Sequence, residues 1–304
     1  MEIRVLRYFL AVAREGTIVR AANFLHVTQP TLSRQLQDLE DELGQKLFIR
    51  SNRNITLTPE GMFLRRRAEE IMEMVNKTET DFSVMGESVR GKVYIGGGES
   101  DAMRLIADVI HSMRQEYPEV RCHIFSGNAA DVMERLDKGI LDFGVLIHPV
   151  DISKYDSITL PAKNLWGVIM RKDSPLAAKK HVEPGDLVNL PLICSRMDDS
   201  GPSRNPFAAW FGAGFEKLNV VATYNLIYNA ALMVDAGIGY ALSLNHLSNI
   251  DSRSSLCFRP LQPRLESGLS IVWKKYQVFN KAAEVFKNRI EENFAADQCG
   301  LRTP

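Results

Sequence analysis

The sequence has few cysteines, no long hydrophobic run and no net charge. Its 304 residues include 4 cysteines, which are far apart and form no C-x-x-C pair. We therefore expect neither a disulfide framework nor a zinc site, and free thiols are typical of a reducing cytosol. Arginines interrupt the apolar residues at the N-terminus, which lacks a signal-peptide cleavage site, and no apolar run is long enough to cross a bilayer. These absences predict a cytoplasmic protein without a membrane partner.

Positive and negative charges are equal in number but unevenly distributed. Residues 1–67 contain 11 Lys and Arg against 7 Asp and Glu, a charge of +4. Subtraction from the totals of 37 and 37 leaves 26 against 30, a charge of −4, for residues 68–304. A basic N-terminal segment permits binding to nucleic acid. The length favours two or three domains.

Three short helices are predicted within the first 44 residues. Apolar residues at helical spacing predict two helices before residue 26, of which Gly16 ends the first and Thr17 can cap the second. Thr28 is placed to cap a third helix, Pro30 lies in its first turn, and Gly44 ends it. One face of this helix carries apolar residues at steps of four, three and four, which we expect to be buried: Leu32, Leu36, Leu39 and Leu43.

Polar side chains surround the first turn of that third helix. If the leucines face inward, Thr31, Ser33, Arg34 and Gln37 project outward or sideways. Such side chains can bind base edges and phosphates, and the second helix of a helix-turn-helix presents its N-terminal residues to the major groove in this way. A simple capping motif on an exposed helix is the alternative, but it explains Thr28 alone.

A short hairpin or wing is predicted after the third helix. Residues 51–54 have the composition of a turn, and residues 55–57 that of a strand. Arg50 and Arg53 flank this turn, where they could contact phosphate.

A long helix is predicted from Pro59, since Thr58 can cap it and Pro59 suits its first position. Its apolar residues alternate by four and three, as in a coiled coil. This pattern favours dimerisation through the helix, and packing against the protein's own body is the alternative. The seam consists of Leu64, Ala68, Ile71, Val75, Thr78, Phe82 and Met85.

From Gly91 strands alternate with helices, which predicts a mostly parallel sheet with helices on both faces. A second set of strands begins after about Pro161, and a late strand and helix could return to the first sheet. Two α/β lobes joined by more than one crossover would enclose a cleft, and ligands in such folds bind beyond the carboxyl ends of the strands.

The N-terminal segment resembles the DNA-binding segment of the LysR-type transcriptional regulators. The residues at that family's spacing are Ala21-Ala22, Gln29-Pro30, Ser33, Leu39-Glu40, Leu43-Gly44, Leu47-Phe48, Arg50 and Thr58-Pro59-Glu60-Gly61. The resemblance implies a winged helix-turn-helix at 1–58, a dimerising linker helix at 59–88 and an effector-binding domain at 91–304. That domain would be a two-lobed α/β fold like the type 2 periplasmic binding proteins, with lobe I at 91–161 and 266–304 and lobe II at 162–265.

The resemblance also implies partners and site residues. It implies dimers or dimers of dimers (a homotetramer) that bind interrupted palindromes in double-stranded DNA and bend it, a small-molecule effector between the lobes, and RNA polymerase as a further partner. The implied DNA-binding residues are Thr28, Gln29, Pro30, Thr31, Ser33, Arg34, Gln37, Arg50 and Arg53. The implied effector-binding residues are Ser100, Ser126, Gly127, Asn128, Ile147, Ser195, Arg196 and Arg204.

Two other classes of function are weaker alternatives. Ser100 lies in a G-x-S-x-A sequence like a hydrolase nucleophile elbow, with Asp235 and His246 in triad order, but such a serine normally follows several strands rather than the first. A pure ligand carrier would be exported, and we expect no signal peptide. The glycines at 96–98 lack the rest of a phosphate-binding motif, and the histidines lack metal-ligand spacing, so we expect no enzyme activity, cofactor or metal.

Overall fold

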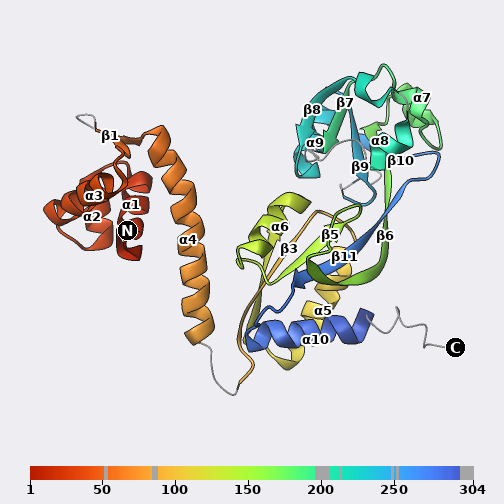
Figure 1. Ribbon diagram of the computed structural model, residues 1–304. Helices are drawn as coiled ribbons and strands as arrows, with labels where there is room; N and C mark the ends of the chain where they lie inside the picture. Colours follow the sequence, from red (N-terminus) through yellow and green to blue (C-terminus); the bar gives the residue numbers. More distant parts are fainter. Residues whose placement is uncertain are drawn as a thin grey trace. The chain divides into compact units, whose positions relative to one another are not determined.

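The computed structural model describes residues 1–50, 54–83, 88–195, 206–212, 214–247, 250 and 253–294 (Figure 1). The chain divides into two compact units, Met1–Ser83 and Val84–Pro304, and each is described by itself.

The first unit contains four helices and a two-stranded antiparallel hairpin among its described residues. Its elements are α1 (Ile3–Glu15), α2 (Ile18–Leu25), α3 (Gln29–Leu43), β1 (Phe48–Arg50), β2 (Ile55–Leu57) and α4 (Pro59–Ser83). The predicted helix limits are confirmed by their caps. Gly16 and Gly44 follow α1 and α3 in the left-handed conformation, with φ of 68° and 64°. The hydroxyl of Thr17 caps α2, and that of Thr28 caps α3.

The core of the first unit joins α1, α2 and α3. Phe9 of α1 is fully buried and packs with its ring centroid 5.2 Å from that of Phe48. Leu32, Leu36 and Leu39 are buried as predicted, but the prediction for Leu43 is wrong, because its side chain is 39% exposed. Leu43 is the last residue of α3, and the helix continues one turn beyond the core that covers Leu39.

The apolar seam of α4 divides into two parts. Leu64 and Ala68 are buried in the core of the first unit, so at these positions the alternative of packing against the protein's own body is correct. Further along, Ile71 is 37% exposed and Phe82 is 66% exposed. Met85 lies outside the described residues.

The second unit is built on one large mixed sheet with the strand order β4-β3-β5-β11-β6-β9-β7-β8, and β10 pairs with β6. Its strands are β3 (Gly91–Gly97), β4 (Val120–Ser126), β5 (Phe143–Ile147), β6 (Tyr155–Arg171), β7 (Leu192–Ser195), β8 (Val220–Tyr224), β9 (Tyr240–Leu244), β10 (Leu256–Pro260) and β11 (Glu266–Lys274). Its helices are α5 (Met103–Glu116), α6 (Ala129–Asp137), η1 (Pro175–Ala178), α7 (Pro184–Leu187), α8 (Pro206–Phe211), η3 (Phe215–Lys217), α9 (Ile227–Asp235) and α10 (Lys281–Phe294).

The prediction of a mostly parallel sheet holds only at the two ends. β3 is parallel to β4 and β5, and β7 is parallel to β8 and β9. The strands between them, β6 and β11, pair antiparallel to each other and to their neighbours. β6 also passes through Pro161, where we expected a new set of strands to begin. The register of β6 with β11 shifts at this point, so Pro161 is not required as a ladder donor.

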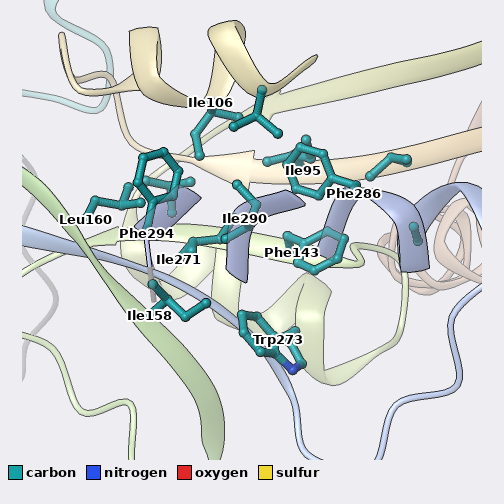
Figure 2. Close-up of a cluster of buried hydrophobic side chains, with 14 of the residues drawn as sticks. Ile95, Ile106, Phe143, Ile158, Leu160, Ile271, Trp273, Phe286, Ile290 and Phe294 are labelled. Carbon is teal, nitrogen blue, oxygen red and sulfur yellow. The ribbon is translucent and has the colours of Figure 1, made fainter. Parts of the chain in front are cut away.

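The two ends of this sheet have separate groups of buried side chains. The first group packs β3, β5, β11 and the first half of β6 against α5 and α10, as Figure 2 shows for Phe143, Ile158 and Phe286. The second half of β6 contributes Val168, Ile169 and Met170 to separate groups with β7, β9 and β10. Each half of the unit, here called lobe I and lobe II, therefore has its own core, and β6 and β11 connect them. The exact lobe limits given above stay a prediction.

Candidate DNA-binding surface and effector site

The first turn of α3 displays polar side chains to solvent. Thr28, Gln29, Pro30, Thr31 and Arg34 are exposed. The hydroxyl of Thr28 accepts the Thr31 backbone N–H at 3.4 Å, and the two threonine hydroxyls lie 2.8 Å apart. Arg34 makes no hydrogen bond or ion pair with any residue that the structure describes, so its guanidinium is available. The helix start therefore presents hydroxyls, an amide and a guanidinium on one surface.

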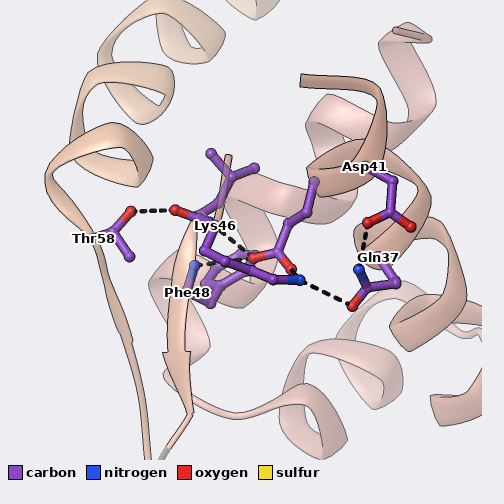
Figure 3. A network of polar contacts seen from close by, with 7 residues as sticks. Gln37, Asp41, Lys46, Phe48 and Thr58 are labelled. Carbon is purple, nitrogen blue, oxygen red and sulfur yellow. Dashed lines mark hydrogen bonds and ion pairs between the residues drawn. The ribbon is translucent and has the colours of Figure 1, made fainter. Parts of the chain in front are cut away.

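Two other predicted contact residues are less exposed. Ser33 and Gln37 are half-buried. The Gln37 amide donates to Asp41 at 2.7 Å, and its oxygen accepts from the Lys46 ammonium at 3.5 Å, as Figure 3 shows. Gln37 is thus held by two charged neighbours, and a contact to DNA would use its remaining hydrogen-bonding capacity.

The Glu40 side chain holds the segment 46–48, which follows α3, in place. The sequence did not reveal this role. One carboxylate oxygen accepts the backbone N–H groups of Leu47 at 2.8 Å and Phe48 at 3.3 Å, and the other accepts from Lys46 at 2.9 Å. The side chain is only 3% exposed. Burial alone would raise the pKa of Glu40, but the Lys46 ammonium and the two backbone donors outweigh it and lower the pKa.

The same segment is connected to the start of α4. The Thr58 hydroxyl donates to the Lys46 carbonyl at 2.7 Å (Figure 3). It also accepts the Gly61 N–H at 2.9 Å. The Ile55 N–H donates to the Gly16 carbonyl at 2.8 Å, so β2 is held against the end of α1. The two strands β1 and β2 are therefore held in place beside α1 and α3. The side chain of Arg50 and all of Arg53 lie outside the described part of the chain.

In the second unit, several predicted effector residues meet at the carboxyl ends of the lobe I strands. The Gly127 N–H donates to the Gly97 carbonyl at 3.1 Å. A Cβ on Gly98 would lie 3.3 Å from the Ile147 side chain and 3.8 Å from the Gly127 carbonyl. Ser126 is exposed at the end of β4, and the Asn128 side chain caps α6 by accepting the Asp131 N–H at 2.9 Å. Ser195 lies half-buried at the end of β7, whereas Arg196 and Arg204 lie outside the described residues.

Ser100 is buried and its hydrogen-bonding groups are occupied. Its hydroxyl donates to Asn164 Oδ1 at 2.7 Å and accepts the Ala102 N–H at 3.1 Å. The Asp235 carboxylate accepts from the Ser255 hydroxyl. Among the described residues no hydrogen bond or ion pair joins His246 to Ser100 or to Asp235. The structure therefore gives no support to a hydrolytic triad.

The glycines before Ser100 are explained by packing. A Cβ on Gly96 would lie 2.4 Å from Leu141 Cδ1, and one on Gly97 would lie 3.3 Å from Val145 Cβ. These residues let neighbouring side chains approach β3 closely.

Asn164 and Glu99 are the polar residues at this place whose contacts the sequence did not reveal. Asn164 lies where β6 passes from lobe I to lobe II, and it is only 2% exposed. Glu99 of lobe I accepts the N–H of Ile227, the first residue of α9 in lobe II, at 2.8 Å. In the sequence Asn164 is only a polar residue directly before the apolar stretch at 165–170, so nothing there indicates its role.

No helix in the described part of the chain is long and apolar enough to span a membrane. Among the same residues, no cluster of three or more His, Cys, Asp or Glu side chains is placed to hold a metal ion.

Two family descriptions match the chain. Residues 86–295 match "LysR substrate binding domain", and residues 3–62 match "Bacterial regulatory helix-turn-helix protein, lysR family".

Similar curated proteins are transcriptional regulators. The Hca operon transcriptional activator HcaR of Escherichia coli (strain K12) is 29% identical over 276 residues, which cover 90% of this chain and 92% of HcaR. The regulator IlvY of the same strain is 32% identical over 213 residues, which cover 69% of this chain and 70% of IlvY. Full-length CbnR, solved in a complex with its target DNA, has a TM-score of 0.70 at 19% identity, covering 96% of this chain and 99% of CbnR. This last likeness shows the fold alone.

Proposed function

Because this chain belongs to the LysR family of transcriptional regulators, we propose that it recognises its operator through the first turn of α3. The chain has a DNA-binding helix-turn-helix and an effector-binding domain, and it is a regulator rather than an enzyme. The observation that carries the proposal is the exposed polar surface at the start of α3. It includes the guanidinium of Arg34, which has no partner among the described residues.

The proposed contacts are divided between bases and phosphates. Arg34 can donate to both major-groove acceptors of a guanine, and the amide of Gln29 can pair with an adenine. Thr28, Thr31 and Ser33 provide hydroxyls for phosphate or base contacts, Pro30 lies against the DNA, and Gln37 reaches from the next turn. Arg50 and Arg53 of the wing bind the backbone, which gives affinity without sequence preference.

Members of this family bind DNA and oligomerise, and we propose that α4 forms the dimer contact here. Its support is the exposure of Ile71 and Phe82 on the distal part of the seam, since Leu64 and Ala68 are used within the first unit. Dimers, or dimers of dimers, would bind an interrupted palindrome in the cytoplasm, and RNA polymerase would be contacted from the bound complex.

The effector site is proposed at the junction of the two lobes. Gly127, Ile147 and the segment around Ser100 meet there, and Ser126, Asn128, Ser195, Arg196 and Arg204 are the further proposed lining residues. An effector that binds one arrangement of lobes and subunits more tightly shifts the population towards it. The spacing of the paired DNA-binding units would then change, and with it the bend of the DNA.

Footprinting tests the DNA-binding part of this proposal. The DNA immediately upstream of the protein's own reading frame is incubated with wild type, Arg34→Ala and Lys217→Ala. Lys217 is an exposed cation of the second unit and controls for the loss of one charge. We expect protection by wild type and Lys217→Ala and weaker protection by Arg34→Ala. Equal protection by all three proteins would contradict a role of Arg34.

A further inference from the structure

Glu99 is an anion at the lobe junction, and no described residue is its cationic partner. One of its oxygens accepts the Ile227 N–H at 2.8 Å, and no Lys, Arg or His among the described residues forms an ion pair with it. The neighbouring Asp101 differs, because it pairs with Arg104 at 2.8 Å. Leu226, before α9, offers no side-chain cap, so the start of α9 takes its acceptor from the other lobe.

The negative charge of Glu99 acts on a side chain of lobe II. Burial raises the pKa of Tyr224 on β8, and the nearby Glu99 carboxylate raises it further. The Tyr224 hydroxyl itself donates to the Leu242 carbonyl at 2.6 Å, so it does not neutralise Glu99.

Asn164 provides the second feature of this place, a buried donor without an acceptor. Its Oδ1 accepts from Ser100, which fixes the amide, and its Nδ2 has no hydrogen-bond partner among the described residues. A buried unsatisfied donor is costly and is rare in native proteins. The Ser100 hydroxyl donates its hydrogen bond to Asn164 and therefore acts as a positioning residue. The free donor at this place is Asn164 Nδ2.

We propose that the effector of this regulator is a small amino-acid-like zwitterion, whose ammonium group pairs with Glu99 and whose carboxylate oxygen accepts from Asn164 Nδ2. The inference rests on the proposed function. Asn164 is hydrogen-bonded to Ser100, the residue next to Glu99, and adjacent residues have their Cα atoms about 3.8 Å apart. In this proposal a zwitterion of amino-acid size spans the two groups. An effector that carries only a carboxylate would meet the negative charge of Glu99, which no described cation pairs with.

The test uses the full-length protein and the common amino acids as probes, with the matching α-keto acids, which lack the ammonium group, as controls. Binding is measured by the shift of the thermal unfolding midpoint and by calorimetry. Three variants are compared with wild type. Glu99→Gln keeps an acceptor for the Ile227 N–H and removes the charge, and Asn164→Asp keeps an acceptor for Ser100 and removes the amide donor. Asp101→Asn is the control, because Asp101 is already paired.

We expect at least one amino acid to bind wild type and Asp101→Asn equally well and to change the operator footprint, while its keto acid does not bind. Loss of a hydrogen bond to a charged group should weaken binding about ten- to hundredfold in Glu99→Gln and in Asn164→Asp. The proposal is overturned if no amino acid binds wild type, or if Glu99→Gln binds the same ligand as tightly. Operator protection in the same samples separates this failure from a failure of the proposed function, because DNA binding would persist in the first case alone.

Discussion

Replacing Glu40 by alanine should loosen the segment between α3 and the wing. The change leaves the backbone N–H groups of Leu47 and Phe48 without their acceptor. Each buried N–H that is left without an acceptor lowers the free energy of unfolding by about 1–3 kcal/mol. Water that enters the vacated space offsets part of this cost. We therefore expect Glu40→Ala to lower the free energy of unfolding by about 3 kcal/mol.

Glu40→Gln separates hydrogen bonding from charge. The amide oxygen still accepts both N–H groups, and only the ion pair with Lys46 is lost. The Lys46 side chain is 65% exposed, so this pair contributes about 1 kcal/mol or less. Glu69→Ala is the control, since Glu69 forms an exposed pair with Arg65 on α4 and its loss should cost about 0.5 kcal/mol or less.

The pH dependence follows from the lowered pKa of Glu40. Because the pKa of the folded state lies below the ordinary value of 4.5, the charged form stabilises the fold fully above 4.5. This contribution is lost as the pH falls through the lowered pKa. The difference between wild type and Glu40→Gln should therefore be constant near neutral pH and should vanish in acid.

Amide hydrogen exchange in the full-length protein measures the local effect. Exchange at Leu47 and Phe48 should accelerate strongly in Glu40→Ala, modestly in Glu40→Gln and not at all in Glu69→Ala. If Glu40→Ala leaves both amides as protected as in wild type, the carboxylate does not hold this segment and the reasoning is refuted.

Three further predictions concern the rest of the molecule. Phe143 is fully buried, and its ring centroid lies 4.9 Å from that of Phe286 and 5.1 Å from that of Phe279. Phe143→Ala should therefore lower the free energy of unfolding in urea by about 3–5 kcal/mol. A cost below about 1 kcal/mol would mean that this core is not packed as described. Phe82→Glu should shift the sedimentation of the protein towards smaller species while its circular dichroism stays unchanged, because it places a charge on the exposed seam of α4; unchanged sedimentation would exclude Phe82 from the contact. Burial raises the pKa of Cys122 and Cys194 to about 11, so both thiols should react slowly with iodoacetamide at neutral pH, faster as the pH rises, and rapidly after unfolding in urea. Fast alkylation of either residue in the folded protein at neutral pH would contradict its burial.

The features that could be predicted from the sequence are those with local causes. Gly16, Thr17, Thr28 and Gly44 end or begin helices through interactions within a few residues, and all four act as predicted. The alternation of strands and helices likewise indicated the α/β architecture of the second unit.

The features that escaped prediction depend on distant partners. Leu43 has the spacing of a core residue, but it lies in the last turn of α3, where the described residues leave its side chain exposed. The antiparallel direction of β6 and β11 follows from pairing between segments about 100 residues apart, as the register Leu165↔Glu266 illustrates.

Residue type alone indicated which side chains of α3 are exposed. It did not indicate the hydrogen bonds of the buried residues at the lobe junction. Arg34 is exposed and unpaired within the described chain, as an interaction with DNA requires. Ser100, in contrast, is turned to Asn164, which lies 64 positions away. Only the fold brings Asn164 to the neighbouring residues Glu99 and Ser100.

The central claim is that α3 recognises base sequence, and a specificity ratio tests it most directly. Affinities for the protected operator and for a scrambled fragment of equal length are measured with wild type and Arg34→Ala over a range of salt concentrations. Loss of a bidentate base contact costs about 1–3 kcal/mol of discrimination, so the ratio should fall about five- to hundredfold in the variant. If both affinities fall equally, Arg34 contacts phosphate alone, and the account of sequence recognition by this turn of α3 is contradicted.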